Sequence, residues 1–188
     1  MALAAAGCGG SSSGGGSSAA STTAVNPNSA EVSPAGDIPD NQAYVAYTPP
    51  GARFSVKVPE GWGRQISGGA VTFTDKLNSI RMETLKASGP LSAAQARSSE
   101  LPKLAKAVKG FSGAKVSTVS RTAGQATRIT YHADSAADPV TGKVRRNAVE
   151  RYVFFHGGRD VVLTLSGPAG ADNVDPWKLV TDSLRWKR

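Results

Sequence analysis

Hydrophobic and polar residues alternate in several short stretches of this chain, as they do in strands that bury one face. The first of these stretches begins with Phe54, Val56 and Val58 and ends at a proline and a glycine. Two more stretches repeat the alternation before the pattern changes. Because the three follow one another closely, we expect an antiparallel meander of strands over FSVKVP (54–59), AVTFTD (70–75) and SIRMETLKA (79–87).

The following segment, PLSAAQARSSELPKLAKAVKGF, has the spacing of a helix. Ser92 and Gln95 have the spacing of a capping box, and Gly110 follows the last apolar residue of the stripe. The pattern predicts a helix from about residue 92 to Val108. Pro102 lies inside it, so we expect the helix to kink or divide there.

Alternation returns after this helix and predicts further strands with tight turns at Gly124 and at Gly157–Gly158. The expected strands are AKVSTVSR (114–121), QATRITYHA (125–133), VRRNAVERYVFFH (144–156) and RDVVLTLSG (159–167). Strands joined by hairpins, with few crossovers, indicate an α+β fold with a largely antiparallel β-sheet flanked by helices.

A last helix is expected in DPWKLVTDSL, with Asp175 as N-cap and Pro176 at the first helical position. Its apolar face should pack back on the sheet. That face consists of Trp177, Val180, Thr181 and Leu184.

The chain before the first strand has a different composition. Residues 9–43 are rich in Gly, Ser and Pro and show no hydrophobic period, so we expect a disordered tether with a reach of roughly 30 to 35 Å. The sequence thus divides into residues 1–8, the tether 9–43 and a domain over 44–188.

Positive charge is confined to the predicted domain. All 22 lysines and arginines lie from Arg53 onward. This part of the chain also holds 11 acidic residues, so its net charge is +11. Such an excess is typical of proteins that bind an anionic lipid or polymer, with a surface charged for solubility as the alternative, while the absence of a recognition motif argues against specific nucleic-acid binding. The nearest approach to a cluster is a candidate anion or partner contact, with a solvated strand end as the alternative: Lys143, Arg145, Arg146 and Arg151.

Few residues could carry catalysis. His132 lies near Asp134 and Asp138, so an imidazole oriented by a carboxylate is one reading and a strand-end histidine beside a polar loop is the other. His156 precedes a hairpin turn. No metal-ligand spacing, phosphate-binding loop or dinucleotide fingerprint is present, so we expect no metal, no cofactor and no enzyme.

Three tryptophans, Trp62, Trp177 and Trp186, follow or open predicted elements. They could line a cleft for a small apolar ligand. Alternatively, they close the ends of the hydrophobic core.

The lone cysteine follows a run of small and apolar residues and precedes the Gly/Ser tract. The segment around Cys8 resembles a bacterial lipobox, whose cysteine is acylated and becomes the mature N-terminus. Ala5 stands where a lipobox usually has leucine, and seven preceding residues are too few for a whole signal peptide. We therefore expect residues 1–8 to be the remnant of a lipoprotein signal peptide, with a functionless cysteine as the alternative.

The domain resembles actinobacterial lipoproteins with a PsbP-like domain. The resemblance covers about 44–187 and depends on FSVKVPEGW (54–62), ELPKLAKAV (100–108), DPVTGKVRRNAVERY (138–152) and NVDPWKLVTDSLRW (173–186). It implies an antiparallel sheet with helices on both sides, and accessory or partner-binding roles without a common enzyme activity.

These observations lead to one main hypothesis and two alternatives. The main hypothesis is a lipoprotein anchored through acylated Cys8 on the outer face of the cytoplasmic membrane, a non-catalytic accessory module of an envelope complex or transporter. The first alternative is an envelope enzyme that uses His132 with Asp134 or Asp138. The second is a carrier of a small ligand or lipid.

Overall fold

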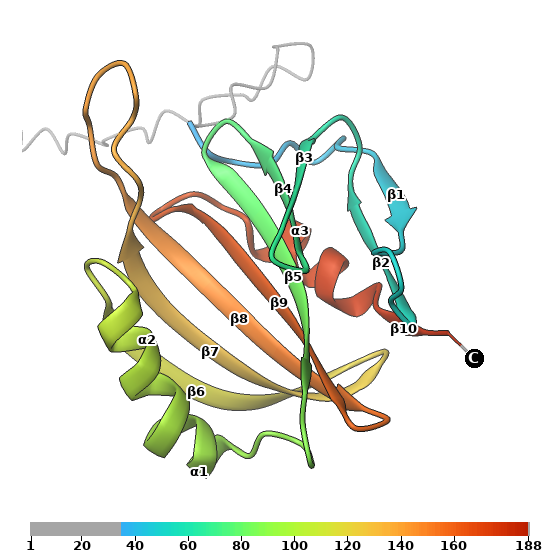
Figure 1. Ribbon diagram of the computed structural model, residues 1–188. Helices are drawn as coiled ribbons and strands as arrows, with labels where there is room; N and C mark the ends of the chain where they lie inside the picture. The colour runs from blue at the N-terminus through green and yellow to red at the C-terminus, as the bar shows by residue number, and fades with distance from the viewer. Residues whose placement is uncertain (1–34, 188) are drawn as a thin grey trace, which may run out of the picture. The chain divides into compact units, whose positions relative to one another are not determined.

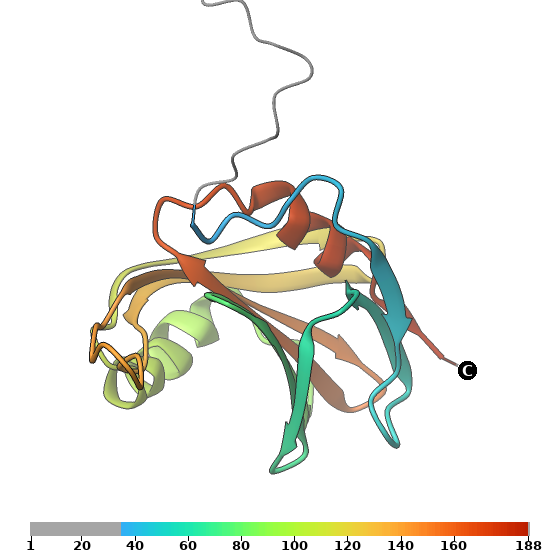
Figure 2. The ribbon, with the colours of Figure 1, turned by 90° about the horizontal axis from the view of Figure 1, so that it is seen from above.

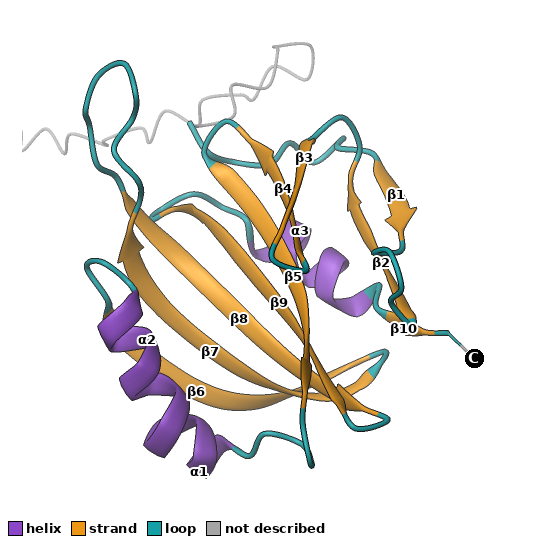
Figure 3. Cartoon of the chain, in the orientation of Figure 1, coloured by secondary structure: helices purple, strands orange, loops and turns teal. Residues whose placement is uncertain are grey.

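Residues 35–187, which the computed structural model describes, build two antiparallel sheets (Figures 1 and 3). The larger sheet has seven strands in the order β3-β4-β5-β9-β8-β7-β6, and the smaller has three in the order β1-β2-β10. The strands are β1 (Tyr44–Tyr47), β2 (Phe54–Pro59), β3 (Gly63–Ser67), β4 (Ala70–Asp75), β5 (Asn78–Lys86), β6 (Ser112–Arg121), β7 (Gly124–Asp134), β8 (Arg146–His156), β9 (Arg159–Pro168) and β10 (Arg185–Trp186).

One face of the large sheet is covered by helix α3 (Val174–Asp182) and the small sheet (Figure 2). Phe54, Val56 and Val58 alternate inward from β2, each at most 2% exposed, as the sequence predicts. Burying side chains of this kind stabilises the fold by roughly 1.5–3 kcal/mol each. The main core lies between these layers, and its large-sheet members include Ile80, Met82, Tyr152, Phe154, Val161, Leu163 and Leu165.

The other face carries one helical segment of three parts: α1 (Ala93–Gln95), a π-helical turn (Ala96–Glu100) and α2 (Leu101–Ala107). The predicted capping box is confirmed, because the Gln95 N–H donates to Ser92 Oγ and the Ser92 N–H donates to Gln95 Oε1. The predicted division is also confirmed. The wide turn ends at Leu101, and Pro102 lies in the first turn of α2, where a missing N–H costs least.

The predicted meander is wrong in one strand. β2 lies in the small sheet, and β3 takes its place beside β4. All five residues of β3 are exposed, so the strand has no hydrophobic alternation by which the sequence could reveal it. The Gly68–Gly69 turn, with positive φ at both residues, folds β3 back onto β4.

The last helix has the predicted inner face but a different start. Trp177, Val180 and Thr181 are buried, as is the adjoining Leu184. The N-cap is Asn173 in place of Asp175, and the helix begins at Val174. The Asn173 side chain does not cap the helix, because it is engaged by another part of the chain.

That other part is the segment Gly36–Ile38, which lies within the predicted disordered tether of residues 9–43. Ile38 is 4% exposed, and its N–H donates to Asn173 Oδ1 at 2.9 Å. Asn173 Nδ2 donates to the Gly36 carbonyl and to Asn78 Oδ1. The folded domain therefore begins before residue 44, because one buried isoleucine in a Gly- and Pro-rich segment forms no periodic pattern.

Replacing Asn173 by alanine should release this segment. The Asn173→Ala change leaves the buried Ile38 N–H without its acceptor, so we expect the free energy of unfolding in urea to fall by about 2–3 kcal/mol. Amide hydrogen exchange should also accelerate at Ile38. The exposed neighbour Asp172 provides a control, since Asp172→Ala should change stability by less than about 0.5 kcal/mol. Equal stability of the two variants would contradict the assigned role.

Candidate binding groove beside helix α3

A hollow of about 280 Å³ lies between the start of α3 and strands β6, β7 and β8. We call it the α3 groove. Its lining combines an indole, an imidazole, a cation and a carboxylate with small and apolar groups. The residues that characterise it are Lys115, Thr130, His132, Glu150, Val174 and Trp177.

Trp177 forms the apolar wall of the α3 groove. The side chain is 7% exposed and packs near Gly167, where an added Cβ would lie 3.5 Å from the indole Cζ2. The buried indole Nε1 has no hydrogen-bond partner among residues 35–187. Val174, one turn earlier, is 71% exposed, so an apolar side chain is also available at the rim.

His132 comes to the groove through an irregularity of the edge strand. The register of β6 against β7 shifts between Ser112 and Lys115, and Gly113 in this bulge has a φ of +65°. A Cβ at Gly113 would lie 3.1 Å from His132 Nδ1. The bulge and the glycine together leave room for the imidazole, which is exposed at the rim.

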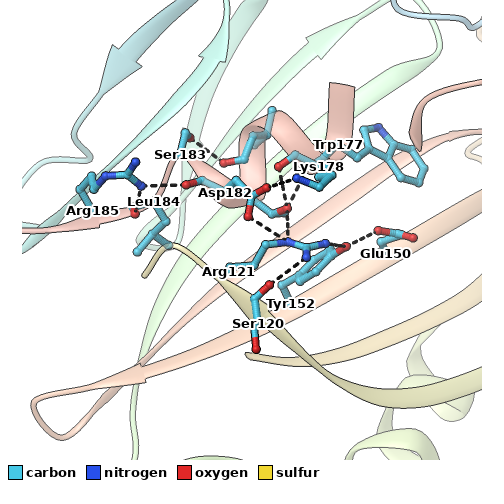
Figure 4. Close-up of polar contacts among 12 residues, drawn as sticks. Ser120, Arg121, Glu150, Tyr152, Trp177, Lys178, Asp182, Ser183, Leu184 and Arg185 are labelled. Atoms are coloured by element: carbon cyan, nitrogen blue, oxygen red, sulfur yellow. Dashed lines mark hydrogen bonds and ion pairs between the residues drawn. The ribbon is translucent and has the colours of Figure 1, made fainter. Parts of the chain in front are cut away.

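A polar network under α3 continues from the groove into the domain (Figure 4). Arg121, whose side chain is 13% exposed, donates from Nε to Thr181 Oγ1 at 3.0 Å and from Nη2 to the Tyr152 hydroxyl at 3.1 Å. Its Nε also lies 3.6 Å from a carboxylate oxygen of Asp182. The guanidinium thus ties α3 to strands β6 and β8.

Tyr152 joins this network to the groove. Its hydroxyl donates to Glu150 Oε2 at 2.5 Å, and Arg128 lies 3.7 Å from the other oxygen of Glu150. Burial, and next the hydrogen bond to Glu150, raises the pKa of Tyr152, so the phenol remains protonated and keeps donating. Glu150 is therefore held in place as the negative group of the α3 groove.

The acid–base pair of the enzyme hypothesis is not assembled. Asp134 pairs with Arg146 at 2.9 Å, and the Asp138 carboxylate accepts hydrogen bonds from the Val140 and Thr141 backbone. Those bonds to Thr141 and Val140 lower the pKa of Asp138, so it remains an ionised acceptor within its own loop. Neither carboxylate forms a hydrogen bond with His132 among the described residues, because each is engaged by closer partners.

The three tryptophans do not share a cleft. Trp62 lines a different hollow, beside Ile38, and Trp177 lines the α3 groove. Trp186 stacks on His156 at a centroid distance of 4.6 Å and donates its indole N–H to the Ala123 carbonyl. All three pack on the main core, because they come from elements that reach it at different ends.

The predicted basic cluster is also divided. Arg146 pairs with Asp134 and donates to the Gly110 carbonyl. Arg151 pairs with Glu83 at 3.3 Å on the face of the sheet that carries the α1–α2 segment. Only two members, Lys143 and Arg145, stay together in the exposed loop after β7. Strand alternation separates Arg146 from Arg151, since residues five apart point to opposite faces.

Sequence reasoning missed Lys115, Thr130, Glu150 and Val174 as groove residues. One signal was available: Glu150 has the same parity in β8 as Tyr152 and Phe154, so the alternation itself points this carboxylate toward the core side. For the others there was no such signal, because the β6 bulge and the position of α3 bring them together.

The described residues contain neither a membrane-spanning helix nor a cluster of metal-ligand side chains. Within residues 35–187, no helix has the length and apolar character that crossing a membrane requires. In the same range, no group of three or more metal-ligand side chains comes together.

Removing the Tyr152 hydroxyl should weaken the network in a pH-dependent way. We expect Tyr152→Phe to lower the free energy of unfolding by about 1–2 kcal/mol near pH 8, because Glu150 and Arg121 each lose a partner. The raised pKa means that the folded state holds the phenol proton more tightly than the unfolded chain, whose tyrosines titrate near ~10.

As the pH rises above that value, the stabilising contribution of the Tyr152 hydroxyl to the native protein declines. The variant lacks this contribution at every pH. The stability difference between the two proteins should therefore narrow from pH 8 to pH values above ~10 in urea unfolding. Tyr47→Phe, at a half-buried tyrosine of β1, is the control for hydroxyl removal. A constant difference across this range would contradict the assigned network.

Comparison with known proteins gives the fold. No family model and no curated protein matches the sequence. The Saccharomyces cerevisiae Ran-binding protein Mog1p is similar in structure, with a TM-score of 0.52 at 11% identity over 77% of this chain and 96% of that chain. Cyanobacterial PsbP (CyanoP) from Synechocystis has a TM-score of 0.50 at 15% identity over 77% of this chain and 93% of that one.

LpqN of Mycobacterium tuberculosis, involved in cell envelope biogenesis, matches at a TM-score of 0.44 and 17% identity, over 78% of this chain and 91% of that chain. That score is too low to support an argument. The likeness to CyanoP and Mog1p, together with the antiparallel sheet covered on both faces, confirms the predicted fold class: the domain has a PsbP-like α+β fold.

Proposed function

We propose that this protein is a non-catalytic binding module, anchored on the outer face of the cytoplasmic membrane through acylated Cys8 and accessory to an envelope complex or transporter. The observation that supports binding is the α3 groove. It places an apolar wall, Trp177, beside a fixed carboxylate, Glu150, which is the usual composition of a recognition site.

The proposal of a non-catalytic role is supported by the chemistry of the groove. Glu150 is engaged by Tyr152 and Arg128, and the carboxylates near His132 are engaged elsewhere. Among the described residues, no carboxylate is hydrogen-bonded to the imidazole. Mog1p is described as a Ran-binding protein, so at least one protein of this fold binds another protein.

The groove is small for a carried lipid. Its volume of about 280 Å³ is close to the lower limit of the range, roughly 300–1,000 Å³, that is usual for sites enclosing a whole small molecule. A single side chain of a partner, flanked by polar contacts, fits such a volume. Exposed Val174 at the rim would extend the apolar contact.

The proposal of membrane attachment depends on Cys8, which lies outside the described residues. Its support is the lipobox-like sequence that leads to Cys8 and the Gly/Ser tract after it. Two acyl chains would hold the protein stably where one would not.

Replacing Cys8 tests the anchor. In cells grown with labelled palmitate, we expect Cys8→Ala to lose the label and to move from the membrane fraction to the soluble fraction. Ser11→Ala, three residues away, should leave both properties unchanged and serves as the control. Equal membrane association of the Cys8→Ala protein would contradict lipid anchoring.

Photo-crosslinking tests the groove. A benzophenone amino acid at Val174 in the anchored protein should give one defined envelope-protein adduct, because this position is exposed at the rim. Thr130→Trp fills the groove and should abolish the adduct, while Thr118→Trp, at an exposed position of β6, should not. An adduct that survives Thr130→Trp would show that the groove is not the binding site.

A further inference from the structure

Two cations lie directly opposite each other at one end of the large sheet. In the antiparallel register of β5 and β9, Lys86 is the partner of Arg159, and both side chains are exposed. Like charges in this position destabilise a sheet. With the Gly157–Gly158 turn they line an open hollow of about 500 Å³.

Further basic residues lie near this pair. His156, the cross-strand partner of Arg159, stacks on Trp186, and the Lys187 N–H donates to the Arg53 carbonyl at 2.9 Å. The stacking of Trp186 on His156 brings β10 to the end of the β8–β9 hairpin. We call this region the basic end and define it as Arg53, Lys86, His156, Arg159 and Lys187.

No carboxylate of residues 35–187 forms an ion pair with the basic end. The acids near these residues along the chain are engaged or oriented elsewhere, and Glu83, which precedes Lys86 in β5, pairs with Arg81 and Arg151. Asp160 points to the opposite face of β9 from Arg159, the face that carries the α1–α2 segment, where burial and next the charge of Glu100 raise its pKa. Asp182 pairs with Arg121 and Lys178.

The basic end lies far from the point where the N-terminal segment joins the domain. Gly36 packs against Pro168 and accepts a hydrogen bond from Asn78, and these residues are at the opposite ends of β9 and β5. Eight residues along β5 correspond to roughly 27 Å. Gly36 and the basic end therefore lie at opposite ends of β5 and β9.

We propose that the basic end binds the phosphate groups of a linear polyanion. The unpaired Lys86 and Arg159, with the exposed Arg53 and Lys187 beside the ends of β2 and β10, offer several cations to the repeated charges of such a chain. At the Gly157–Gly158 turn, which has no side chains, the ligand can approach the backbone closely.

Two other polyanions fit this surface less well. Insertion into a membrane needs several exposed apolar side chains; the hairpin tip offers only glycines, and exposed Leu85 lies on the opposite face of β5 from Lys86. Single-stranded nucleic acid needs free aromatic faces for its bases, and Trp186 is already stacked on His156. A phosphate polymer without bases is the ligand that the surface favours.

The test uses the full chain carrying Cys8→Ser and medium-length polyphosphate as the probe, with affinity measured by calorimetry. We expect Lys86→Ala with Arg159→Ala to weaken binding roughly tenfold or more and to reduce the dependence of affinity on salt. Lys143→Ala with Arg145→Ala is the matched control: it removes one lysine and one arginine from the cluster that the sequence predicted. This control should change affinity less than about twofold.

The variants also separate binding from folding. Because the first pair removes a like-charge contact, its thermal unfolding midpoint should not fall, so lost binding cannot be attributed to lost structure. Absence of polyphosphate binding, or an equal loss in both pairs, would overturn the proposal. Binding to phosphatidylglycerol vesicles or to single-stranded DNA in preference to polyphosphate would also overturn it. The result is independent of Cys8 acylation and of the α3 groove, so it leaves the proposed function to its own tests.

Discussion

Strand β9 buries side chains on both of its faces, and the rest of the structure depends on satisfying both. Val161 and Leu163 point to the main core, while Val162 between them is buried on the opposite side. A sheet with such a central strand must be covered twice. Helix α3 and the small sheet cover one face, and the α1–α2 segment packs on the other face over residues of β7 and β8 such as Ile129 and Val149 (Figure 2).

Helix α3 combines this packing role with the formation of the α3 groove. Its N-cap residue Asn173 holds the segment Gly36–Ile38, its buried face carries Trp177, and its last turn binds Arg121 through Thr181. Polar groups are costly inside a protein unless they are paired, so the network fixes the helix in one position. Fixing the helix also fixes the groove, and a preformed site loses less conformational freedom on binding.

Charge is distributed in an equally ordered way. Around the loop after β7 and beneath α3, carboxylates pair with Arg146, Arg128 and Arg121, so positive charge there is compensated. At the basic end, Lys86 and Arg159 have no such partners among the described residues. The net charge of the sequence therefore says little about where an anion binds, because local pairing decides which cations remain available.

The sequence alone predicted most strands, both helical segments, the Ser92–Gln95 capping box, the division near Pro102 and the α+β class, because alternation, helical spacing and turn glycines are local properties. Residues 54–58 and 177–184 were assigned to the core for the same reason. β3 and the Gly36–Ile38 segment were missed because neither has a local hydrophobic period. The groove, the Arg121–Tyr152–Glu150 network and the pairing of Lys86 with Arg159 depend on strand order and register, which are decided only when distant segments pack together.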